Sequence, residues 1–327
     1  MRAAIFEHLG PARDVLRVID LADVPPGSGE VQVEVQASGV NPTDVKLRGG
    51  APGRKLAFPL IVPHHDGAGV ITHVGAGVDV RRIGQRVWVY GAQNGRAFGT
   101  SAQYVTLPAR LAVPLSDTLS FDEGACLGVP AMTAWEAVMG DGPPKGDIVL
   151  VTGGAGNVGR YAVQLARLAG ARVIATVSSE AKAIVACEAG AEATVDYTAP
   201  DAAAQILDMT KRLGVTRVVD VDTTRNAALI ANVIAPGARV ISYGSGALDA
   251  AIPVRDFRQK NATIRFLNIL RLPPDHLDRN AFALNSALAS GGITHGIDSR
   301  FPLAEIAAAH EKIESGTAIG RVLVHPS

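Results

Sequence analysis

Residues 63–69 read PHHDGAG and contain a cluster of side chains with metal-binding chemistry. Two adjacent histidines, His64 and His65, precede Asp66 and a run of small residues. Neutral imidazole and carboxylate are ordinary zinc ligands, and a catalytic zinc takes three ligands from the protein. The stretch raises a question that decides which reactions are open to the chain. It either holds a catalytic metal or retains only part of such a site.

A glycine-rich stretch, GGAGNVG at 153–159, is the second candidate site. It follows the apolar run DIVLVTG and opens NVGRYAVQLARLAG, whose apolar residues recur at helical spacing, so it lies between a strand and a helix. Glycine permits unusual dihedrals at a tight turn, and without a Cβ the backbone can approach a pyrophosphate at the helix N-terminus. In this context the spacing predicts a dinucleotide site rather than a strand–helix turn without a ligand.

The end of the next strand bears on which dinucleotide binds. An NAD site usually has Asp or Glu there, bonded to the ribose 2′-hydroxyl. Here the strand ends Val177-Ser178-Ser179, and Lys182 follows. The serines can donate to a 2′-phosphate and the lysine supplies positive charge, so the sequence favours NADPH. In the alternative interpretation Ser179 caps the next helix and Lys182 is solvated on its surface; both can hold at once.

Length and composition bound the class of protein. The 327 residues exceed what one hydrophobic core usually covers, and 47% of them are apolar, so two globular domains are expected. Lys plus Arg equals Asp plus Glu, 31 each, which gives no general attraction to nucleic acid or anionic membrane. No signal peptide or membrane span is evident, so we expect a cytoplasmic protein. Cys126 and Cys187 lie in apolar surroundings and are expected to be reduced core thiols.

Two patterns of periodicity divide the chain into the elements that must position these residues. Residues 1–123 contain runs of alternating polarity such as VQVEVQ at 31–36, with Gly and Pro between them, which predicts a β-rich domain. From Asp147 short apolar runs alternate with helical patterns, which predicts βαβ units on a parallel sheet over 124–268. The remainder, 269–327, holds two helical patterns and the strand GRVLVHP, and we expect it to return to the first domain.

Together these residues resemble the medium-chain dehydrogenase/reductase superfamily, and most of all its zinc-free quinone oxidoreductase branch, the zeta-crystallin-like proteins. The resemblance covers essentially the whole chain, through ASGVNPTDVKLRGG, PHHDGAGVITHVGAGV, GTSAQYVTLPA, ACLGVPAMTAWEAV, VLVTGGAGNVGRYAVQLA and HEKIESGTAIGRVLV in family order. It implies an α/β fold: a GroES-like β-rich catalytic domain and a Rossmann domain with a doubly wound parallel sheet. It also implies a homodimer built through the cofactor domain, in keeping with the apolar segment TIRFLNIL at 263–270.

The resemblance also bears on the metal. Zinc-dependent relatives have a cysteine where this chain has Asn41, a Gly-His-Glu motif at the place of His64-His65-Asp66, and a second cysteine near Val129. Both cysteines are missing, as is the cysteine-rich structural zinc lobe, and two weak ligands do not complete a three-ligand site. We therefore expect no metal. The two histidines are expected either to form a turn at the floor of the cleft, bonded to backbone, or to contact the substrate.

The resemblance implies a set of site residues. It places Asn41 and Asp44, from the N-P-x-D element, beside the nicotinamide and the substrate. Lys46 stands where many relatives have a substrate-facing tyrosine. Asn41, Lys46 and the two histidines, His64 and His65, are candidate donors to the substrate oxygen. The further cofactor-binding residues that it implies are Thr133, Gly153, Gly156, Asn157, Val158, Gly159, Ser178, Ser179, Lys182, Tyr197, Gly244, Ser245, Leu267, Asn268 and Arg321.

These features predict an NADPH-dependent reductase of quinones or α,β-unsaturated carbonyls, acting by direct hydride transfer on a small molecule without a metal. One alternative is a reductase of enoyl thioesters or other alkenes. Another, of a different class, is an NADPH-binding protein that binds RNA or serves as bulk structural protein, against which the balanced charge argues. For Asn41 the alternatives are a preorganised amide donor and an Asx-turn in which the side chain bonds only its own backbone.

Overall fold

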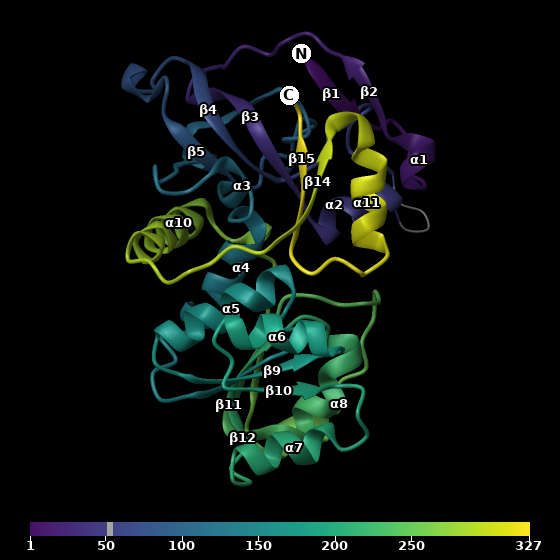
Figure 1. Cartoon of the computed structure of the whole chain (residues 1–327), viewed down its shortest axis with the longest axis vertical. Coiled ribbons are helices and arrows are strands. Elements are labelled where there is room, and N and C mark those ends of the chain that lie inside the picture. The colour runs from purple at the N-terminus through teal and green to yellow at the C-terminus, as the bar shows by residue number, and fades with distance from the viewer. Residues whose placement is uncertain (51–54) are drawn as a thin grey trace. The chain divides into compact units, whose positions relative to one another are not determined.

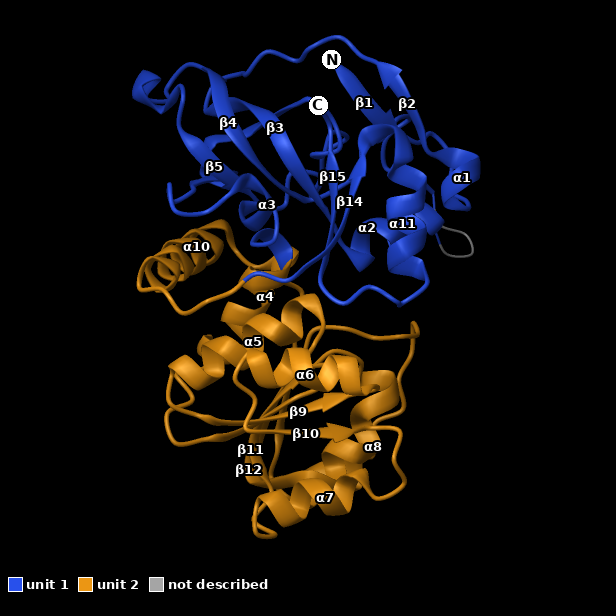
Figure 2. Ribbon diagram, in the orientation of Figure 1, with its two compact units in different colours: residues 1–129, 295–327 blue, residues 130–294 orange. Residues whose placement is uncertain are grey.

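The computed structural model describes residues 1–50 and 55–327, and its contacts divide the chain into two units (Figure 2). Unit 1 comprises residues 1–129 and 295–327, and unit 2 comprises residues 130–294. The return to unit 1 begins at His295 rather than at 269, because helix α10 (Pro274–Ala289) belongs to unit 2. There His276 and Asn280 bond the buried carboxylate of Glu136.

Unit 1 is built on a sheet of order β14-β15-β3-β4-β5-β7, with β6 paired to β3. Its strands are β3 (Glu30–Val40), β4 (Asp66–Val74), β5 (Arg86–Val89), β6 (Tyr104–Pro108), β7 (Ala112–Pro114), β14 (Ile297–Pro302) and β15 (Arg321–His325). A separate pair joins β1 (Arg2–Ile5) to β2 (Arg17–Asp20). Val31, Val33 and Val35 of β3 are buried, as the alternating pattern predicts.

Short helices complete unit 1 and close its core. They are α1 (Ala12–Val15), α2 (Pro42–Gly49), α3 (Phe121–Gly124), α11 (Ile306–Glu314), and the 3₁₀ turns η1 (Val80–Arg82), η2 (Ala109–Leu111) and η4 (Leu303–Glu305). One core cluster joins Val40 of β3, Val45 of α2, Ala309 of α11 and Val322 of β15. This packing holds the start of α2 against β15, although the two are far apart in sequence.

Unit 2 carries a parallel sheet of order β10-β9-β8-β11-β12-β13. Its strands are β8 (Ile148–Val151), β9 (Arg172–Val177), β10 (Ala193–Asp196), β11 (Val215–Asp220), β12 (Ile234–Ser242) and β13 (Thr263–Phe266). The chain order reverses between β8 and β11, which is the doubly wound arrangement whose ligands bind beyond the carboxyl ends of the strands. The predicted α/β fold class is confirmed.

Helices connect these strands, and in Figure 1 α5 and α7 lie on opposite sides of them. The helices are α4 (Gly128–Met139), α5 (Asn157–Leu168), α6 (Glu180–Glu188), α7 (Ala202–Met209), α8 (Thr223–Val233), α9 (Val254–Gln259), α10 and the 3₁₀ turn η3 (Ile269–Arg271). None of the helices in residues 1–50 and 55–327 is long and apolar enough to span a bilayer. Both cysteines are free; Cys126 is buried, but the expected burial of Cys187 is wrong, because it lies on an exposed face of α6.

Candidate functional site

The loop between β8 and α5 has the geometry that a phosphate-binding turn requires. Gly153 has φ +66°, and a Cβ on Gly159 would lie 2.2 Å from the Gly153 carbonyl oxygen. A Cβ on Gly154 would lie 2.6 Å from the Cβ of Ala175. The fold itself therefore needs these three glycines. Gly156 differs: it is exposed at the N-terminus of α5, where an added Cβ would meet only the Gly153 oxygen at 3.3 Å, so it leaves the outer face of the loop open.

Ser178, Ser179 and Lys182 come together at the end of β9. The Lys182 Nζ donates to Ser178 Oγ over 3.1 Å, and Ser179 Oγ caps α6 by accepting from the backbone N–H of Lys182. The cap and the cluster of donors therefore coexist. Tyr197, just beyond β10, lies alongside, since its backbone N–H donates to the carbonyl of Val177. Hydroxyl and ammonium donors thus gather where an NAD site would have an acid.

A pocket with a volume of about 370 Å³ opens at the carboxyl ends of β11, β12 and β13. Three of the predicted cofactor residues, Gly244, Ser245 and Leu267, line it. Asn268, the next residue, is exposed and uses its side chain to accept the backbone N–H of Leu270. Of the remaining unit 2 candidates, Thr133 is buried on α4, and Asn157 and Val158 are the first two residues of α5 and are half-buried.

The sequence analysis did not identify Asp220, the carboxylate that links the ends of β8, β11 and β12 by hydrogen bonds. Asp220, at the end of β11, is 0% exposed and accepts hydrogen bonds from Thr152 beyond β8 (2.9 Å), Asn226 on α8 (2.8 Å) and Ser242 on β12 (3.2 Å). The signal that could have found it is an acid at the end of the apolar run RVVDV, where a buried charge needs several donors. Asp220 holds the glycine loop and the pocket wall in one network.

In unit 1, Asn41, Asp66 and Arg321 form a buried hydrogen-bonded group, which we name the Asn41 triad. Asn41 Nδ2 donates to Asp66 Oδ2 (2.7 Å), and the Arg321 guanidinium donates to Asn41 Oδ1 (2.6 Å) and Asp66 Oδ2 (2.6 Å). The three side chains meet because β3 pairs with β4 on one side and with β15 on the other. The idea that Asn41 bonds only its own backbone is wrong, since its side chain joins two other strands.

Burial of the triad changes what Arg321 does. Its side chain is 1% exposed and is bound inside unit 1, a role that no sequence signal revealed. The contact of Arg321 with the cofactor, which the resemblance implies, stays a prediction. Both carboxylate oxygens of Asp66 are hydrogen-bonded, because the second one, Oδ1, accepts the backbone N–H of Val129 at 2.9 Å.

Asp44 and His65 lie beside the triad. Asp44 is 1% exposed, and its Oδ2 accepts the backbone N–H of Asn41 at 2.7 Å. Its Oδ1 is 3.8 Å from His65 Nε2 and has no hydrogen-bond partner among the described residues. Burial raises the pKa of Asp44 to about 6, against the opposing charge of His65. Lys46, the other candidate on α2, is exposed.

His64 faces the interior of unit 1. Its backbone has φ +80°, and its ring bonds Ser38 Oγ through Nδ1 (2.8 Å) and His310 Nε2 through Nε2 (3.0 Å), with the two imidazoles stacked. The His64 carbonyl accepts the backbone N–H of Thr100, but the His64 ring bonds side chains and not the backbone that we expected it to bond. A ring with no exposed surface does not reach a substrate without local rearrangement, and His65 is the histidine next to Asp44.

The hydrogen bonds around His64 fix its tautomer. Thr100 Oγ1 gives its only hydrogen to the carbonyl of Asp66, so Ser38 must donate to Thr100, and His64 Nδ1–H must donate to Ser38. The bare His64 Nε2 then accepts from His310 Nε2–H. Burial lowers the pKa of both rings, that of His310 to about 3, so both are neutral. We name this chain of groups the His64 relay; it fastens α11 to β3.

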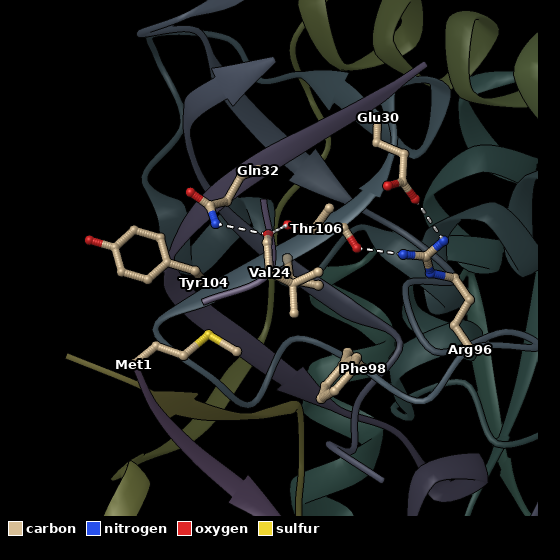
Figure 3. Close-up of a pocket in the computed structure, with 9 residues that line it drawn as sticks. Met1, Val24, Glu30, Gln32, Arg96, Phe98, Tyr104 and Thr106 are labelled. Carbon is tan, nitrogen blue, oxygen red and sulfur yellow. Dashed lines mark hydrogen bonds and ion pairs between the residues drawn. The ribbon is translucent and has the colours of Figure 1, made fainter. Parts of the chain in front are cut away.

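Within residues 1–50 and 55–327 no three His, Cys, Asp or Glu side chains come together in a group that could hold a metal ion. A small pocket of about 60 Å³ lies in unit 1 (Figure 3). Polar side chains that line this pocket bond each other and the backbone: Arg96 bonds Glu30 and the Thr106 carbonyl, and Gln32 donates to the Val24 carbonyl.

Comparisons with known proteins agree with this geometry. Residues 27–117 match the alcohol dehydrogenase GroES-like domain family, and residues 157–276 match the zinc-binding dehydrogenase family. Quinone oxidoreductases of Rattus norvegicus and Homo sapiens are 31% and 30% identical, each match covering 99% of this chain and 97% of the relative.

Solved structures give the same result. An NAD-dependent alcohol dehydrogenase has a TM-score of 0.91 at 28% identity, with 99% of both chains covered. A mycobacterial protein complexed with NADPH has a TM-score of 0.88 at 28% identity, with 100% of both covered. The two domain matches, the full-length relatives and the common fold place this chain, an oxidoreductase, in the quinone oxidoreductase branch of the medium-chain dehydrogenase/reductase superfamily.

Proposed function

We propose that this oxidoreductase uses NADPH to reduce quinones or α,β-unsaturated carbonyl compounds by direct hydride transfer without a metal. The observation that carries the choice of cofactor is the contact of Lys182 with Ser178 at the end of β9. An ammonium and two hydroxyls match a 2′-phosphate, whereas an acid at this place would match a ribose hydroxyl. The mycobacterial relative described with NADPH supports the same choice.

The residues of unit 2 fit this cofactor. The open face at Gly156 suits the pyrophosphate at the N-terminus of α5, and the pocket lined by Gly244, Ser245 and Leu267 suits the nicotinamide end. When bound, NADPH supplies the hydride. The chain then has to orient the acceptor and stabilise the negative charge that grows on its oxygen. We assign the second task to the Asn41 amide, which has one N–H left after donating to Asp66.

The residues at the Asn41 triad do not fit a zinc ion. Both oxygens of Asp66 accept hydrogen bonds, one of them from the Arg321 guanidinium, and a metal cation there would repel that charge. An amide replaces the cysteine of the zinc-dependent relatives at Asn41. We therefore expect purified protein to lack stoichiometric zinc and to keep its activity in chelator. One zinc per chain by elemental analysis, lost together with activity, would refute this part of the proposal.

The activity is tested with a panel of quinones, enones and enoyl thioesters, with NADPH consumption as the readout. Reduction of a quinone or enone is expected, and Asn41→Ala should lower its kcat/KM by roughly 10²-fold without unfolding the protein. Preference for enoyl thioesters would move the substrate class to that alternative. No turnover of any acceptor, together with retention of single-stranded RNA, would replace the proposal by the binding-protein alternative.

A further inference from the structure

The buried ion pair between Asp66 and Arg321 holds the amide of Asn41 from both sides. The carboxylate accepts from the amide nitrogen, and the guanidinium donates to the amide oxygen. The two charged groups also bond each other, and their side chains are 0% and 1% exposed. The two charged groups have almost no water contact through which they could relax, while Asn41 keeps 3% of its surface exposed.

The pair allows only one orientation of the amide. Rotating it by half a turn would bring its nitrogen to the position 2.6 Å from an Arg321 donor and its oxygen to the position 2.7 Å from an Asp66 acceptor. Both contacts would be repulsive in a buried site, where unpaired polar groups are most costly. The orientation therefore follows from the charges on either side.

The backbone around the pair leaves room only for these two side chains. A Cβ on Gly39 would lie 2.2 Å from a terminal nitrogen of Arg321, and a Cβ on Gly128 would lie 2.1 Å from Cγ of Asp66. Glycine on β3 and at the start of α4 thus provides the space for the ion pair. Neither glycine has a positive φ, so close approach rather than dihedral freedom explains it.

We propose that Asp66 and Arg321 are positioning residues that orient the Asn41 amide, so that its second N–H is presented to the oxygen of the substrate. The inference rests on the proposed function, because it names what keeps the assigned donor in place. The positive charge at this place belongs to a side chain of the protein, Arg321, whereas the zinc-dependent relatives hold a metal ion there.

The first test is a double-mutant cycle of Arg321→Lys and Asn41→Ala. Lysine keeps the charge opposite Asp66 but loses the fork that reaches both partners, so Arg321→Lys should lower kcat about 10-fold. In the Asn41→Ala background the same change should leave kcat unchanged, because Arg321 acts through the amide. Losses that multiply in the double variant would overturn the inference.

A matched control separates positioning from general destabilisation. Arg217 in unit 2 is also buried, pairs with Asp147 and donates to the Val138 carbonyl, and it does not touch the triad. Arg217→Lys should lower the melting temperature while leaving kcat and the NADPH dissociation constant near those of the wild type. A fall in kcat as large as that of Arg321→Lys would show that the effect is only structural.

The second test exchanges the two partners. Asn41→Asp puts two carboxylates together, and Asp66→Asn leaves Arg321 without a counter-charge, so each single variant should melt early. The double exchange restores the total charge and lets the amide at 66 donate to the carboxylate at 41. It should recover the melting temperature but stay about 10²-fold low in kcat, since position 41 then lacks an N–H. Recovery of kcat would overturn the inference.

The side-chain amide of Asn41 gives a readout that needs no turnover. With ¹⁵N-asparagine labelling, an amide held between Asp66 and Arg321 should show two separate N–H resonances, one of them shifted by the carboxylate. Arg321→Lys should move both, whereas Arg217→Lys should move neither. If the wild type reduces no acceptor but this pattern is present, the proposed function fails and the orientation of the amide stands. If the wild type is active and the pattern is absent, the inference fails alone.

Discussion

At the scale of single residues, the His64 relay keeps the imidazoles of His64 and His310 buried and neutral. His310 has a pKa of about 3 in the folded protein because of burial and the nearby Arg48 charge, whereas an ordinary imidazole titrates near 6.5. Between these values the unfolded chain binds a proton that the folded chain rejects. The free energy of unfolding therefore falls as the pH falls from about 6.5 towards 3.

The variant His310→Gln tests this pH dependence. Its amide can donate to His64 Nε2 as His310 does, but it cannot take up a proton. From this residue the wild type should lose on the order of 2–3 kcal/mol of unfolding free energy between pH 7 and pH 4, and the variant should lose correspondingly less. Urea unfolding at several pH values measures the difference. Parallel curves for the two proteins would mean that His310 does not titrate as its burial implies.

We expect Lys182 to determine the discrimination between NADPH and NADH. Lys182→Ala should weaken NADPH binding by roughly 1–3 kcal/mol, the range for one charged contact to phosphate, and should leave NADH binding unchanged. Titration of both cofactors by fluorescence or calorimetry gives the comparison. Equal losses for the two would show that Lys182 does not contact the 2′-phosphate.

At the scale of elements, the loop between β8 and α5 contains glycines that the fold needs and one, Gly156, that we predict the cofactor needs. Gly159→Ala places a Cβ 2.2 Å from a backbone oxygen, so it should lower both the melting temperature and NADPH affinity. Gly156→Ala needs only a small shift, because its Cβ would be 3.3 Å from the same oxygen. It should keep the melting temperature of the free protein and still weaken NADPH about 10-fold or more, by standing where the pyrophosphate approaches. A Gly156→Ala protein with normal affinity would place the cofactor elsewhere.

Periodicity predicted the βαβ elements well because each of these helices and strands follows from a pattern of neighbouring residues. The pattern over NVGRYAVQLARLAG gave α5, and RVIATVS gave β9, each within a few residues of its observed ends. Helix α2 was not predicted, because its eight residues, PTDVKLRG, have no apolar stripe. Only Pro42 and Asp44, near its start, are typical of a helix N-terminus.

The sequence named candidate site residues but did not predict which of them contact each other. Ser179 and Lys182 are three residues apart, so their meeting follows from the start of one helix. Arg321 meets Asn41 across 280 residues of sequence, and only the pairing of β3 with β15 brings them together. The resemblance located both residues, yet a single sequence contains no record of that pairing. For the same reason the partnership of His64 with His310 was not foreseen.

At the scale of the whole molecule, β13 is one of the two outer strands of the unit 2 sheet, the other being β10, and it pairs only with β12 among the described strands. An outer strand can pair with a second copy, and β13 carries the exposed apolar side chain of Phe266, so we predict a homodimer through this edge in solution. Thr263→Lys on β13 should give monomers, because it would bring like charges together across the pair. The same substitution on the opposite edge, Thr194→Lys on β10, should leave the dimer intact. A monomeric wild type by light scattering at micromolar concentration would contradict the prediction.

The division of unit 1 into two segments determines the order in which the protein can be completed during synthesis. Unit 2 is one continuous stretch, residues 130–294, and can fold as soon as it leaves the ribosome. Unit 1 must wait for residues 295–327, because β15 is the neighbour of β3 in its sheet and supplies Arg321. Until then residues 38–40 of β3 lack the strand with which they pair, and Asp66 lacks its counter-charge. We therefore expect the nascent chain to pass through a state in which unit 2 has folded while unit 1 is incomplete and can associate with other chains.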